Sequence, residues 1–576
     1  MIKLFKHLKS FIWLIMITII LIYIQTMIDL SLPDYMSRIV NRGIINKDMN
    51  YIWDIGYQMV LIALGGALVT IAISFLASRI STAFARDIRT KVFAKVESFS
   101  LVEFNKFGTA SLITRTTNDI TQLRMFIFML LRVLISAPIM AIGGYLKAIN
   151  KSPSLSWIIG VSVGILVIAI VTLLTIGIPK IKILQQSIDK LNLIIREHLT
   201  GIRVIKAFNN EQYQEEKFDV ANIKYRKINL FLNRLMVVLN PMMMLVMNIT
   251  VIGIVWFGAK KVDIGVLQIG DMLAFMQYVM QIMISFLMLS MMFIILPRAS
   301  VSANRLNEVI TMNPIIKDPA TSGEIDKTKQ GYVEFNNVTF SYPNAESPVL
   351  NDINFIAKPN QVTAFIGGTG SGKSTIINLI PRFYDVTSGQ ILVDGVDVRN
   401  IKQHELRAKI GYVPQKGVLF SGTIADNLRY GKEDATNEEM EEATKIAQIY
   451  DFINNKEDKL EALIAEGGTN VSGGQKQRLS IARAIIKKPS IYIFDDSFSA
   501  LDFKTDKILR KALKKQIKDA TVLIVTQRIS TIMDADQIVV LDKGKIVGIG
   551  NHKYLMNTCD VYKEMALSQL SKEELV

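Results

Sequence analysis

The sequence predicts two parts of different fold class: an all-α membrane domain of six helices, followed by an α/β domain. Three observations lead to this division. Half of the 576 residues are hydrophobic and the mean hydropathy is positive, which is typical of a chain that lies partly in a membrane. Six long apolar runs fall in the first 300 residues. Beyond them, strand-like and helical patterns alternate around a glycine-rich loop.

The six apolar runs are long enough to cross a bilayer, which takes about 20 mostly apolar residues. They lie near residues 11–34, 56–79, 126–147, 157–178, 235–258 and 270–296. Two long stretches between them, 80–125 and 179–234, are polar but keep a helical pattern. We therefore expect the membrane helices to continue as long extensions on one side of the membrane. Because the number of spans is even, both ends of the chain should lie on that same side.

The net charge of +15 is compatible with two kinds of partner, a nucleic acid or a membrane surface. The basic residues form no single run; many lie between apolar spans, at Arg79, Arg86, Arg89, Lys91 and Lys95 and again from Lys180 to Arg234. Cytoplasmic loops carry such charges by the positive-inside rule, and anionic lipid attracts them. Basic residues in the first external loop weaken this rule without reversing it. We expect lipid contact and no nucleic acid.

Cysteine and histidine usage excludes two further classes of site. The single cysteine, Cys559, allows neither an intrachain disulfide framework nor a Cys-based metal site, and the four histidines are scattered. The first apolar run, from Phe11 to Leu30, lacks a small-residue cleavage site. It is therefore expected to remain as a membrane helix, not to be removed as a signal peptide.

The chain is predicted to divide into a membrane domain with intracellular extensions, a linker and an α/β domain, at residues 1–310, 311–330 and 331–576. The linker residues are polar, include Pro314 and show no periodicity. Beyond the linker, runs such as Tyr332–Phe335 and Val362–Ile366 have strand character and alternate with helical patterns. This alternation predicts a largely parallel core sheet.

A glycine-rich loop follows the expected strand at 362–366 and opens an expected helix at 374–380. It reads Gly367-Gly368-Thr369-Gly370-Ser371-Gly372-Lys373-Ser374 and is followed by Thr375. This is the P-loop pattern in the context that it requires. Its glycines let backbone N–H groups converge on phosphates, and the helix N-terminus adds a positive dipole. Lys373 should reach the β- and γ-phosphates and Ser374 should ligate Mg²⁺, so the loop predicts ATP binding.

A second apolar strand carries an acidic residue suited to the same nucleotide. The run Ile491–Phe494 ends in Asp495, which from the carboxyl edge of the sheet can hold the Mg²⁺ shell. An apolar run that ends in aspartate is weak evidence by itself. Downstream of a P-loop, and shortly before Ser499-Ala500-Leu501-Asp502, it becomes strong.

Together these residues resemble one family, the ATP-binding cassette (ABC) transporters, specifically bacterial half-transporter exporters of the multidrug type. The resemblance covers essentially the whole chain. Val471-Ser472-Gly473-Gly474-Gln475 is similar to the family signature, Pro414-Gln415 to the Q-loop and Ser499–Asp502 to the D-loop. Glu466-Gly467-Gly468 resembles the segment that senses the membrane domain, and Tyr342 lies where the family stacks an aromatic ring on adenine.

The membrane half shares in the resemblance. Glu197–Phe208 resembles the exporter stretch that leads to a coupling helix, while Phe104–Gly108 and Leu112–Arg115 resemble the first intracellular loop. The resemblance implies the type IV exporter fold, ATP and Mg²⁺ as cofactors, and Gln415 as a further magnesium and catalytic residue beside Ser374 and Asp495. It also implies a bacterial cytoplasmic membrane, with both termini and the nucleotide-binding domain in the cytoplasm.

The resemblance further implies that two such domains pair head to tail. Each ATP then lies between the P-loop of one chain and the signature of the other. Ser472, Gly473, Gly474 and Gln475 would act on the nucleotide of the partner, and Asp502 of the D-loop would belong to the same shared site. A serine hydroxyl and backbone N–H groups near a helix start are suited to a γ-phosphate.

Two positions depart from the family pattern. Asp496 stands where the family usually has a glutamate that orients or deprotonates the attacking water, and Gln527 stands where a histidine closes on the γ-phosphate. Aspartate is one methylene shorter, and glutamine donates a hydrogen bond but carries neither the charge nor the proton of imidazole. Loss of a positioned acid–base group typically costs about 10²–10⁴-fold in rate. ATP binding should survive, because the P-loop is untouched.

The two departures predict that the chain is the degenerate subunit of a heterodimer. The heterodimer exports hydrophobic or amphipathic small molecules, and the partner holds the consensus catalytic site. The alternative is that Asp496 is a tolerated change in a homodimer. A lipid or peptide exporter and a non-transporting, ATP-binding regulatory subunit also stay open. In the membrane half, Asp29 and Arg132 lie at membrane depth, where charges are costly. They are expected either to pair, to face a cavity or to lie at an interface.

Overall fold

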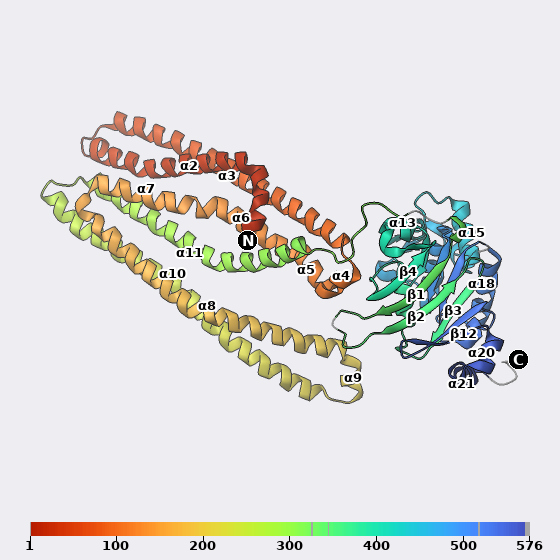
Figure 1. The fold of residues 1–576 in the computed structure, drawn as a ribbon. Helices are drawn as coiled ribbons and strands as arrows, with labels where there is room; N and C mark the ends of the chain where they lie inside the picture. Colours follow the sequence, from red (N-terminus) through yellow and green to blue (C-terminus); the bar gives the residue numbers. More distant parts are fainter. Residues whose placement is uncertain (1, 324–326, 344, 517–518, 571–576) are drawn as a thin grey trace. The chain divides into compact units, whose positions relative to one another are not determined.

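The computed structural model describes residues 2–323, 327–343, 345–516 and 519–570 (Figure 1). The contacts within the chain divide it into two units. The first unit holds the residues up to 97 together with 110–312, and the second holds 98–109 together with the residues from 313 onward. The division therefore falls close to the start of the predicted linker, but residues 98–109 belong to the second unit although the sequence places them in the membrane half.

The first unit is all-helical. Its long helices are α2 (Ile12–Arg38), α3 (Met49–Glu97), α6 (Ile120–Met129), α7 (Ser136–Lys151), α8 (Ser156–Thr200), α10 (Glu211–Asp263) and α11 (Ile269–Thr311). Short helical segments complete it: α1 (Ile2–Phe5), η1 (Lys6–Phe11), η2 (Ile39–Ile44), α5 (Thr109–Thr114), η3 (Arg115–Asp119), η4 (Leu130–Leu134), η5 (Pro153–Leu155) and α9 (Ile202–Ala207). Over the described residues, six helical stretches are long and apolar enough to cross a membrane. The six predicted spans are confirmed.

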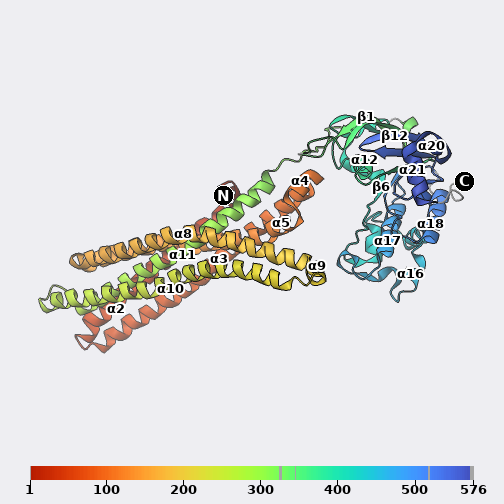
Figure 2. The ribbon, with the colours of Figure 1, turned by 90° about the horizontal axis from the view of Figure 1, so that it is seen from below.

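The polar stretches between the spans are helical, as the sequence predicts. Helix α8 has 45 residues and α10 has 53, and the two run side by side (Figure 2). At 1.5 Å per residue a 53-residue helix is about 80 Å long, more than twice the hydrocarbon thickness of a bilayer. A buried hydrogen bond between the hydroxyls of Ser162 and Thr250, 2.7 Å apart, joins α8 to α10. Helix α9 closes the turn between the two extensions.

The spans pack in pairs, α2 with α3 and α7 with α11. Phe275 and Tyr278 of α11 are fully buried and pack into a cluster with Leu30 of α2. The hydroxyl of Tyr278 donates to the carbonyl of Leu30, at 3.2 Å. The third span is not one regular helix, because the π-helical segments η3 and η4 interrupt it on either side of α6. Such π-helical turns are frequent at functional sites.

An ion-pair network joins α2, α7 and α11 near one end of the spans. The ammonium of Lys147 lies 2.7 Å from Asp34, and that of Lys151 lies 3.2 Å from Asp34 and 2.8 Å from Asp271. Ser37 donates to Asp271 at 2.7 Å. Lys147 of α7 is thereby placed beside Asp34 of α2, which fixes the register of these two helices.

The second unit is an α/β domain. Its strands are β1 (Val333–Phe340), β2 (Leu350–Ala357), β3 (Val362–Gly367), β4 (Ser388–Val393), β5 (Val396–Asp397), β6 (Ile410–Val413), β7 (Gly422–Thr423), β8 (Leu463–Ile464), β9 (Ile491–Asp495), β10 (Thr521–Val525), β11 (Gln537–Asp542) and β12 (Lys545–Gly550). Within the described residues they form a six-stranded sheet in the order β12-β11-β3-β10-β9-β6, a four-stranded sheet β2-β1-β4-β5 and the pair β7-β8. In the large sheet β11, β3, β10, β9 and β6 are parallel and only β12 is antiparallel. The predicted parallel core is confirmed.

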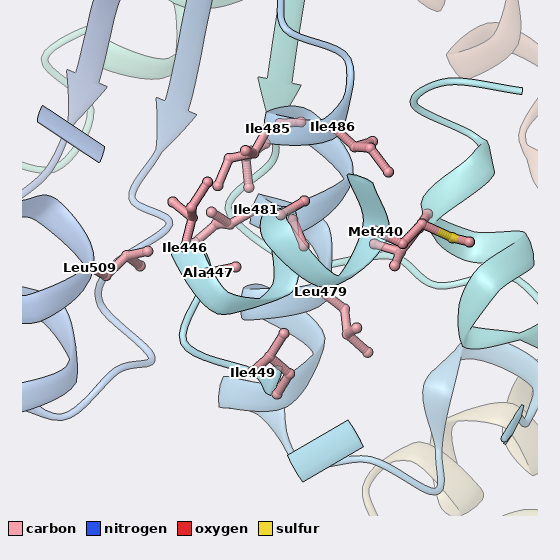
Figure 3. Close-up of a cluster of buried hydrophobic side chains, with 14 of the residues drawn as sticks. Met440, Ile446, Ala447, Ile449, Leu479, Ile481, Ile485, Ile486 and Leu509 are labelled. Carbon is pink, nitrogen blue, oxygen red and sulfur yellow. The ribbon is translucent and has the colours of Figure 1, made fainter. Parts of the chain in front are cut away.

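Helices cover these sheets. They are α12 (Lys373–Leu379), α13 (Gln403–Ala408), α14 (Ile424–Arg429), α15 (Asn437–Ile446), α16 (Tyr450–Asn454), α17 (Gly473–Ile486), α18 (Phe503–Gln516), α19 (Ile529–Ile532), α20 (His552–Thr558) and α21 (Asp560–Gln569), with the short turns η6 (Lys327–Lys329), η7 (Val398–Asn400), η8 (Lys459–Glu461) and η9 (Glu466–Gly468). Leu479 and Ile481 of α17 pack among Met440 and Ile446 of α15 (Figure 3). This apolar contact holds α17, whose first residues carry the signature motif.

Helix α4 (Leu101–Phe107) of the second unit comes from the predicted first intracellular loop. Ser100 caps it: the hydroxyl accepts from the N–H of Val102 and donates to the carboxylate of Glu103 at 2.6 Å. The buried Glu103 also accepts from the backbone N–H of Ile315, at 2.9 Å. A hydrogen bond from Asn105 to the hydroxyl of Tyr384, 3.4 Å long, adds a second tie. These contacts explain why residues 98–109 group with the α/β domain.

Acid is expected to loosen this attachment. Burial alone would raise the pKa of Glu103, but hydrogen bonds from Ser100 and from the N–H of Ile315 together lower it below its ordinary value. A carboxylate with a depressed pKa in the folded state stabilises the fold above its unfolded value, near pH 4.5. That stabilisation is lost as the pH falls through the folded pKa. The protection of the Ile315 amide, measured as exchange relative to the intrinsic rate at each pH, should therefore fall below about pH 4.5, and Glu103→Gln should remove this dependence. An unchanged pH profile in the variant would contradict the assignment.

Candidate ATP site

The motif-bearing strands are neighbours in the large sheet. Val525, the last residue of β10, pairs with Phe365 of β3 on one side and with Asp495 of β9 on the other. Because the three strands are parallel, the P-loop after β3, Asp495 at the end of β9 and the turn after β10 lie at one edge of the sheet. Ligands of open α/β sheets bind at the carboxyl ends of the strands. The topology thus assembles motifs that are up to about 160 residues apart in the sequence.

The P-loop needs its glycines for both conformation and space. Gly372 has a φ of +99°, and a Cβ atom there would lie 2.5 Å from a methyl carbon of Leu350. A Cβ on Gly367 would lie 2.2 Å from the carbonyl oxygen of Leu541. Only glycine satisfies these positions. Helix α12 begins at Lys373, one residue before its predicted start.

Lys373 is buried and folds back across the loop. Its ammonium donates to the carbonyls of Gly367 and Gly368, at 2.8 and 2.7 Å. Burial lowers the pKa of Lys373, and the carboxylates of Asp496 and Asp495 oppose that shift. A buried cation that is hydrogen-bonded to neutral carbonyls is stabilised when an anion replaces those carbonyls as its partner. The position suits a lysine that transfers its hydrogen bonds to phosphate oxygens.

Ser374 and Asp495, the two residues predicted to hold Mg²⁺ with Gln415, lie in direct contact. The hydroxyl of Ser374 donates to a carboxylate oxygen of Asp495 at 2.9 Å. Mg²⁺ takes oxygen ligands at about 2.0–2.1 Å in octahedral geometry, so two adjacent ligand oxygens lie about 3 Å apart. The observed separation therefore fits two adjacent ligands of one Mg²⁺. Burial raises the pKa of Asp495, and the hydrogen bond from Ser374 opposes that shift.

Tyr342 and Thr375 of the predicted nucleotide set also come together. The tyrosine hydroxyl lies 3.2 Å from the hydroxyl of Thr375. The ring of Tyr342 meets Phe340 and Tyr384 edge to face, with ring centres 4.9 and 5.2 Å apart. This aromatic group holds the Tyr342 ring beside the helix that follows the P-loop.

Gln415 has an exposed side chain in the loop after β6. Its loop is held by Gln477, a residue of the family-like run Lys476–Arg478 that follows the signature, through a contact that the sequence did not predict. The buried Gln477 of α17 donates to the carbonyl of Pro414 at 3.1 Å and accepts from the N–H of Gly417 at 3.0 Å. Gln477 lies two residues after the signature motif, so the Q-loop and the signature helix are joined through one side chain.

The signature residues cap their own helix. Ser472 accepts from the N–H of Gln475 at 3.3 Å, and the side chain of Gln475 accepts from the N–H of Ser472 at 2.8 Å. This reciprocal capping box starts α17 at Gly473, two residues before its predicted start. Ser472 and Gly473 are exposed. In the D-loop, Asp502 accepts from the N–H of Thr505 at 2.9 Å and starts α18 in the same manner.

Asp496 has a left-handed backbone, with a φ of +44°. Its N–H donates to the carbonyl of Val525 at 2.8 Å, which joins β9 to β10 beyond their last pair. Aspartate and asparagine tolerate this region better than most other residues with a side chain. The site of the first departure from the family pattern is thus a position where the backbone itself favours aspartate.

Gln527 is exposed, and its loop is held by groups far along the chain. Gln569 of α21 donates to the carbonyl of Gln527 at 2.7 Å and accepts from the N–H of Ile529 at 2.9 Å. Arg528 donates to the carbonyl of Ser499 at 2.7 Å, which connects this loop to the D-loop. Sequence reasoning found neither contact, because Gln569 and Arg528 belong to no motif.

Asp29 and Arg132 of the membrane unit line one cavity of about 280 Å³. Asp29 accepts from the side-chain amide of Gln25, at 3.0 Å. Among the described residues Asp29 has no ion-pair partner within 4 Å, so the predicted alternative of a direct pair with Arg132 is not what the structure shows. Both side chains face the same cavity.

Comparisons with known proteins agree with this site and fold. The family model for the ABC transporter transmembrane region matches residues 15–286, and the ABC transporter model matches residues 350–499. An uncharacterized ABC transporter ATP-binding protein of Mycobacterium tuberculosis is 40% identical over 573 residues, covering 98% of this chain and 97% of its own. A multidrug resistance ABC transporter ATP-binding and permease protein of Lactococcus lactis is 30% identical, covering 95% and 92%.

A solved structure of a bacterial Atm1-family ABC exporter with ATP bound is similar over almost the full length. The TM-score is 0.82 at 25% identity, and the match covers 98% of this chain and 99% of that one. The membrane unit therefore has the six-helix type IV exporter fold, and the α/β unit is its ATP-binding domain. The chain is a multi-pass membrane protein. It belongs to the ABC transporter family, as an exporter half-transporter with an ATPase domain.

Proposed function

We propose that the chain is the degenerate-site subunit of a heterodimeric exporter in a bacterial cytoplasmic membrane. The observation that carries the proposal is a contrast within one site. The groups for phosphate and Mg²⁺ are in place, since Ser374 lies 2.9 Å from Asp495. The two positions for water activation and γ-phosphate contact hold Asp496 and Gln527 instead of glutamate and histidine. The site is thus built to hold ATP and poorly equipped to hydrolyse it.

In the proposed site each group has one task. Lys373 leaves the loop carbonyls for the β- and γ-phosphates, while Ser374, Asp495 and Gln415 hold the metal shell and Tyr342 stacks on the base. Mg²⁺, when bound, neutralises phosphate charge. Ser472 faces the nucleotide of the partner chain. Because its oxygen already accepts from Gln475, its own O–H is free to donate to a phosphate.

The proposed cycle uses ATP to close the two nucleotide-binding domains on each other. ATP must bind the closed pair better than the open one, and two shared sites supply that difference. Residues 331–576 form the ATP-binding domain, 311–330 the linker and 1–310 the membrane domain that carries substrate. We place both termini and the ATP-binding domain in the cytoplasm. Hydrolysis at the partner's intact site then resets the transporter.

We propose hydrophobic or amphipathic small molecules as cargo. Two observations support this class: the membrane unit contains a cavity with apolar and polar walls, and the Lactococcus lactis relative is named for multidrug resistance. Membrane lipid is the second proposed partner, because basic residues lie between the spans.

The direct test is the ATPase activity of the purified chain alone. It should bind ATP with Mg²⁺ but hydrolyse it at least about 10²-fold more slowly than the complex with a homologous half-transporter that has glutamate and histidine at these positions. Robust, cooperative hydrolysis or transport by the chain alone would contradict the proposal. It would favour a homodimeric exporter in which the Asp496 carboxylate suffices.

Ser472→Ala should affect the two nucleotide sites of the complex differently. In the complex it should lower hydrolysis at the partner's site by about 10²-fold, the usual cost of removing a donor aimed at developing charge. The affinity of this chain's own P-loop for ATP should not change. Loss of the helix cap costs about 1 kcal/mol, so Thr436→Ala is the matched control. Thr436 caps α15 with an equivalent capping box, and its replacement should leave the ATPase rate intact.

A further inference from the structure

The cavity of the membrane unit has one strongly polar corner. Helices α2, α3 and α11 and the η4–α7 stretch enclose it. At the polar corner lie Asp29 and Gln25 of α2 and Gln281 of α11. Elsewhere the lining is largely apolar and includes Ile73 and Met288. A carboxylate at membrane depth is costly unless something compensates it.

The N–H groups of both glutamines are already committed to Asp29. Gln25 donates to the Asp29 carboxylate, at 3.0 and 3.2 Å from its two oxygens. Gln281 donates to the backbone carbonyl of Asp29 at 3.1 Å. That carbonyl needs an outside donor, because its partner in a regular helix would be the N–H of residue 33, and Pro33 has none. These bonds fix which atom of each amide is the oxygen.

Both amide oxygens are left without a partner. Oε1 of Gln25 and Oε1 of Gln281 are buried and, in the part of the chain that the structure describes, accept no hydrogen bond. Buried acceptors without a donor are rare and unfavourable. Two such oxygens beside an unpaired carboxylate form a group with three acceptors and an excess of negative charge. What this corner lacks is a cation that carries hydrogen-bond donors.

Arg132 also lines the cavity but forms no ion pair with Asp29, so it does not serve as that cation. The pair of Lys147 with Asp34 sets α7 beside α2. Arg132 precedes Lys147 by 15 residues, and Asp29 precedes Asp34 by five. Arg132 and Asp29 therefore differ by about ten residues in their position along the helices. At 1.5 Å per residue this is roughly 15 Å along the helices. This separation agrees with the finding that, among the described residues, Arg132 makes no ion pair with Asp29 within 4 Å.

We propose that this cavity binds amphipathic molecules through a protonated primary amine. The ammonium lies on the Asp29 carboxylate, and its three N–H donors match the carboxylate and the oxygens of Gln25 and Gln281. Gln25 and Gln281 line the cavity while their amide oxygens are buried, so the proposal requires the two terminal amides to turn toward the ligand. The apolar body extends along Ile73 and Met288. Only the statement that the bound amine is cargo for export rests on the proposed function. The binding itself does not depend on it.

The hydrogen-bond donors of the ligand distinguish this site from one that recognises positive charge alone. A quaternary ammonium has the same charge but no N–H group, so it can use the field of Asp29 and none of the acceptors. A hydrogen bond to a charged group typically contributes about 10- to 100-fold in affinity. The cavity should thus prefer a primary amine to a quaternary one on the same body, even though both are lipophilic cations.

The test uses one fluorescent body with three head groups, on the full-length chain in lipid nanodiscs without ATP. Dansylcadaverine has a primary amine; its N,N,N-trimethyl derivative keeps the charge but lacks donors, and its N-acetyl derivative is neutral. Corrected for binding to empty nanodiscs, dansylcadaverine should bind about tenfold or more tightly than either derivative. Equal affinity for the primary and trimethyl probes would overturn the proposal, and this comparison requires no variant.

Variants then locate the site. Asp29→Asn should weaken dansylcadaverine binding about 10- to 100-fold and leave binding of the N-acetyl probe unchanged, which also shows that the cavity is intact. The matched control is Asp54→Asn, which removes the same charge from an exposed place on α3 outside the cavity. Unchanged dansylcadaverine affinity in Asp29→Asn would overturn the assignment. Because binding is measured without ATP, a failure of ATP-driven transport would count against the proposed function and not against this site.

Discussion

Replacing Asp496 by glutamate and Gln527 by histidine together is expected to raise ATP hydrolysis by the purified chain about 10²–10⁴-fold. The magnitude is that of restoring a positioned acid–base group. Glutamate adds the methylene that brings a carboxylate nearer to the attacking water, and histidine supplies a ring nitrogen toward the γ-phosphate. The two substitutions should suffice because the other groups of the proposed site are unchanged: Ser374 contacts Asp495, and the P-loop keeps its glycines.

The single variants divide this effect between the two positions. Asp496→Glu alone should give part of the gain, and it carries a small cost because residue 496 has a positive φ that aspartate tolerates better than glutamate. The affinity for ATP should stay the same in every variant, measured by equilibrium binding with Mg²⁺. If the double variant hydrolyses ATP no faster than the natural chain, the two residues are not what limits the rate.

Lys373→Ala is expected to weaken ATP binding by about 10- to 100-fold. The estimate is the contribution of a hydrogen bond to a charged group, 1.5–3 kcal/mol. The lysine is buried beside the loop that receives the phosphates and bonds two of its carbonyls. Its removal eliminates the cation that the β- and γ-phosphates would meet. Equilibrium binding of ATP with Mg²⁺ to the purified chain measures the effect.

Lys487→Ala is a close control for that experiment. Lys487 also donates to two backbone carbonyls, those of Arg407 and Ile410, at 2.6 and 2.8 Å. Burial lowers its pKa, as it does for Lys373. Its loss should reduce thermal stability and leave ATP affinity near the natural value. Equal losses of affinity in the two variants would show that Lys373 acts on the fold and not on phosphate.

The parts that the sequence predicted correctly depend on length and local pattern. A span needs a fixed number of apolar residues, and the six runs were long enough to identify without any knowledge of packing. The P-loop and Asp495 could be placed because each follows an apolar strand, and parallel strands bring their carboxyl ends to one edge. Helix starts were missed by one or two residues at Lys373 and Gly473.

The parts that could not be predicted depend on side-chain contacts between distant segments. Gln477 holds the Q-loop from 63 residues away, and Gln569 holds the loop of Gln527 from 42 residues away. Gln477 follows the signature in a run, Lys476–Arg478, that itself resembles the family, but no local pattern shows which distant segment either glutamine contacts. Likewise, the side chain of Gln281 donates a hydrogen bond to the carbonyl of Asp29, 252 residues earlier in the chain, in place of the N–H that Pro33 lacks. Asp29 was found from its charge at membrane depth, but the two amides around it became visible only in the structure.

Ser472 and Gln475 of the signature motif also cap α17. Evolutionary retention of the motif can therefore have a cause other than activity. Each side chain bonds the backbone N–H of the other residue and so stabilises the start of α17 by itself, which means that selection for folding acts on both positions. Retention of the motif in a descendant is then explained by folding, even where the chain no longer assists a partner. Divergence at Gln527, which neither a cap nor a left-handed backbone favours, is the better record of lost or retained activity.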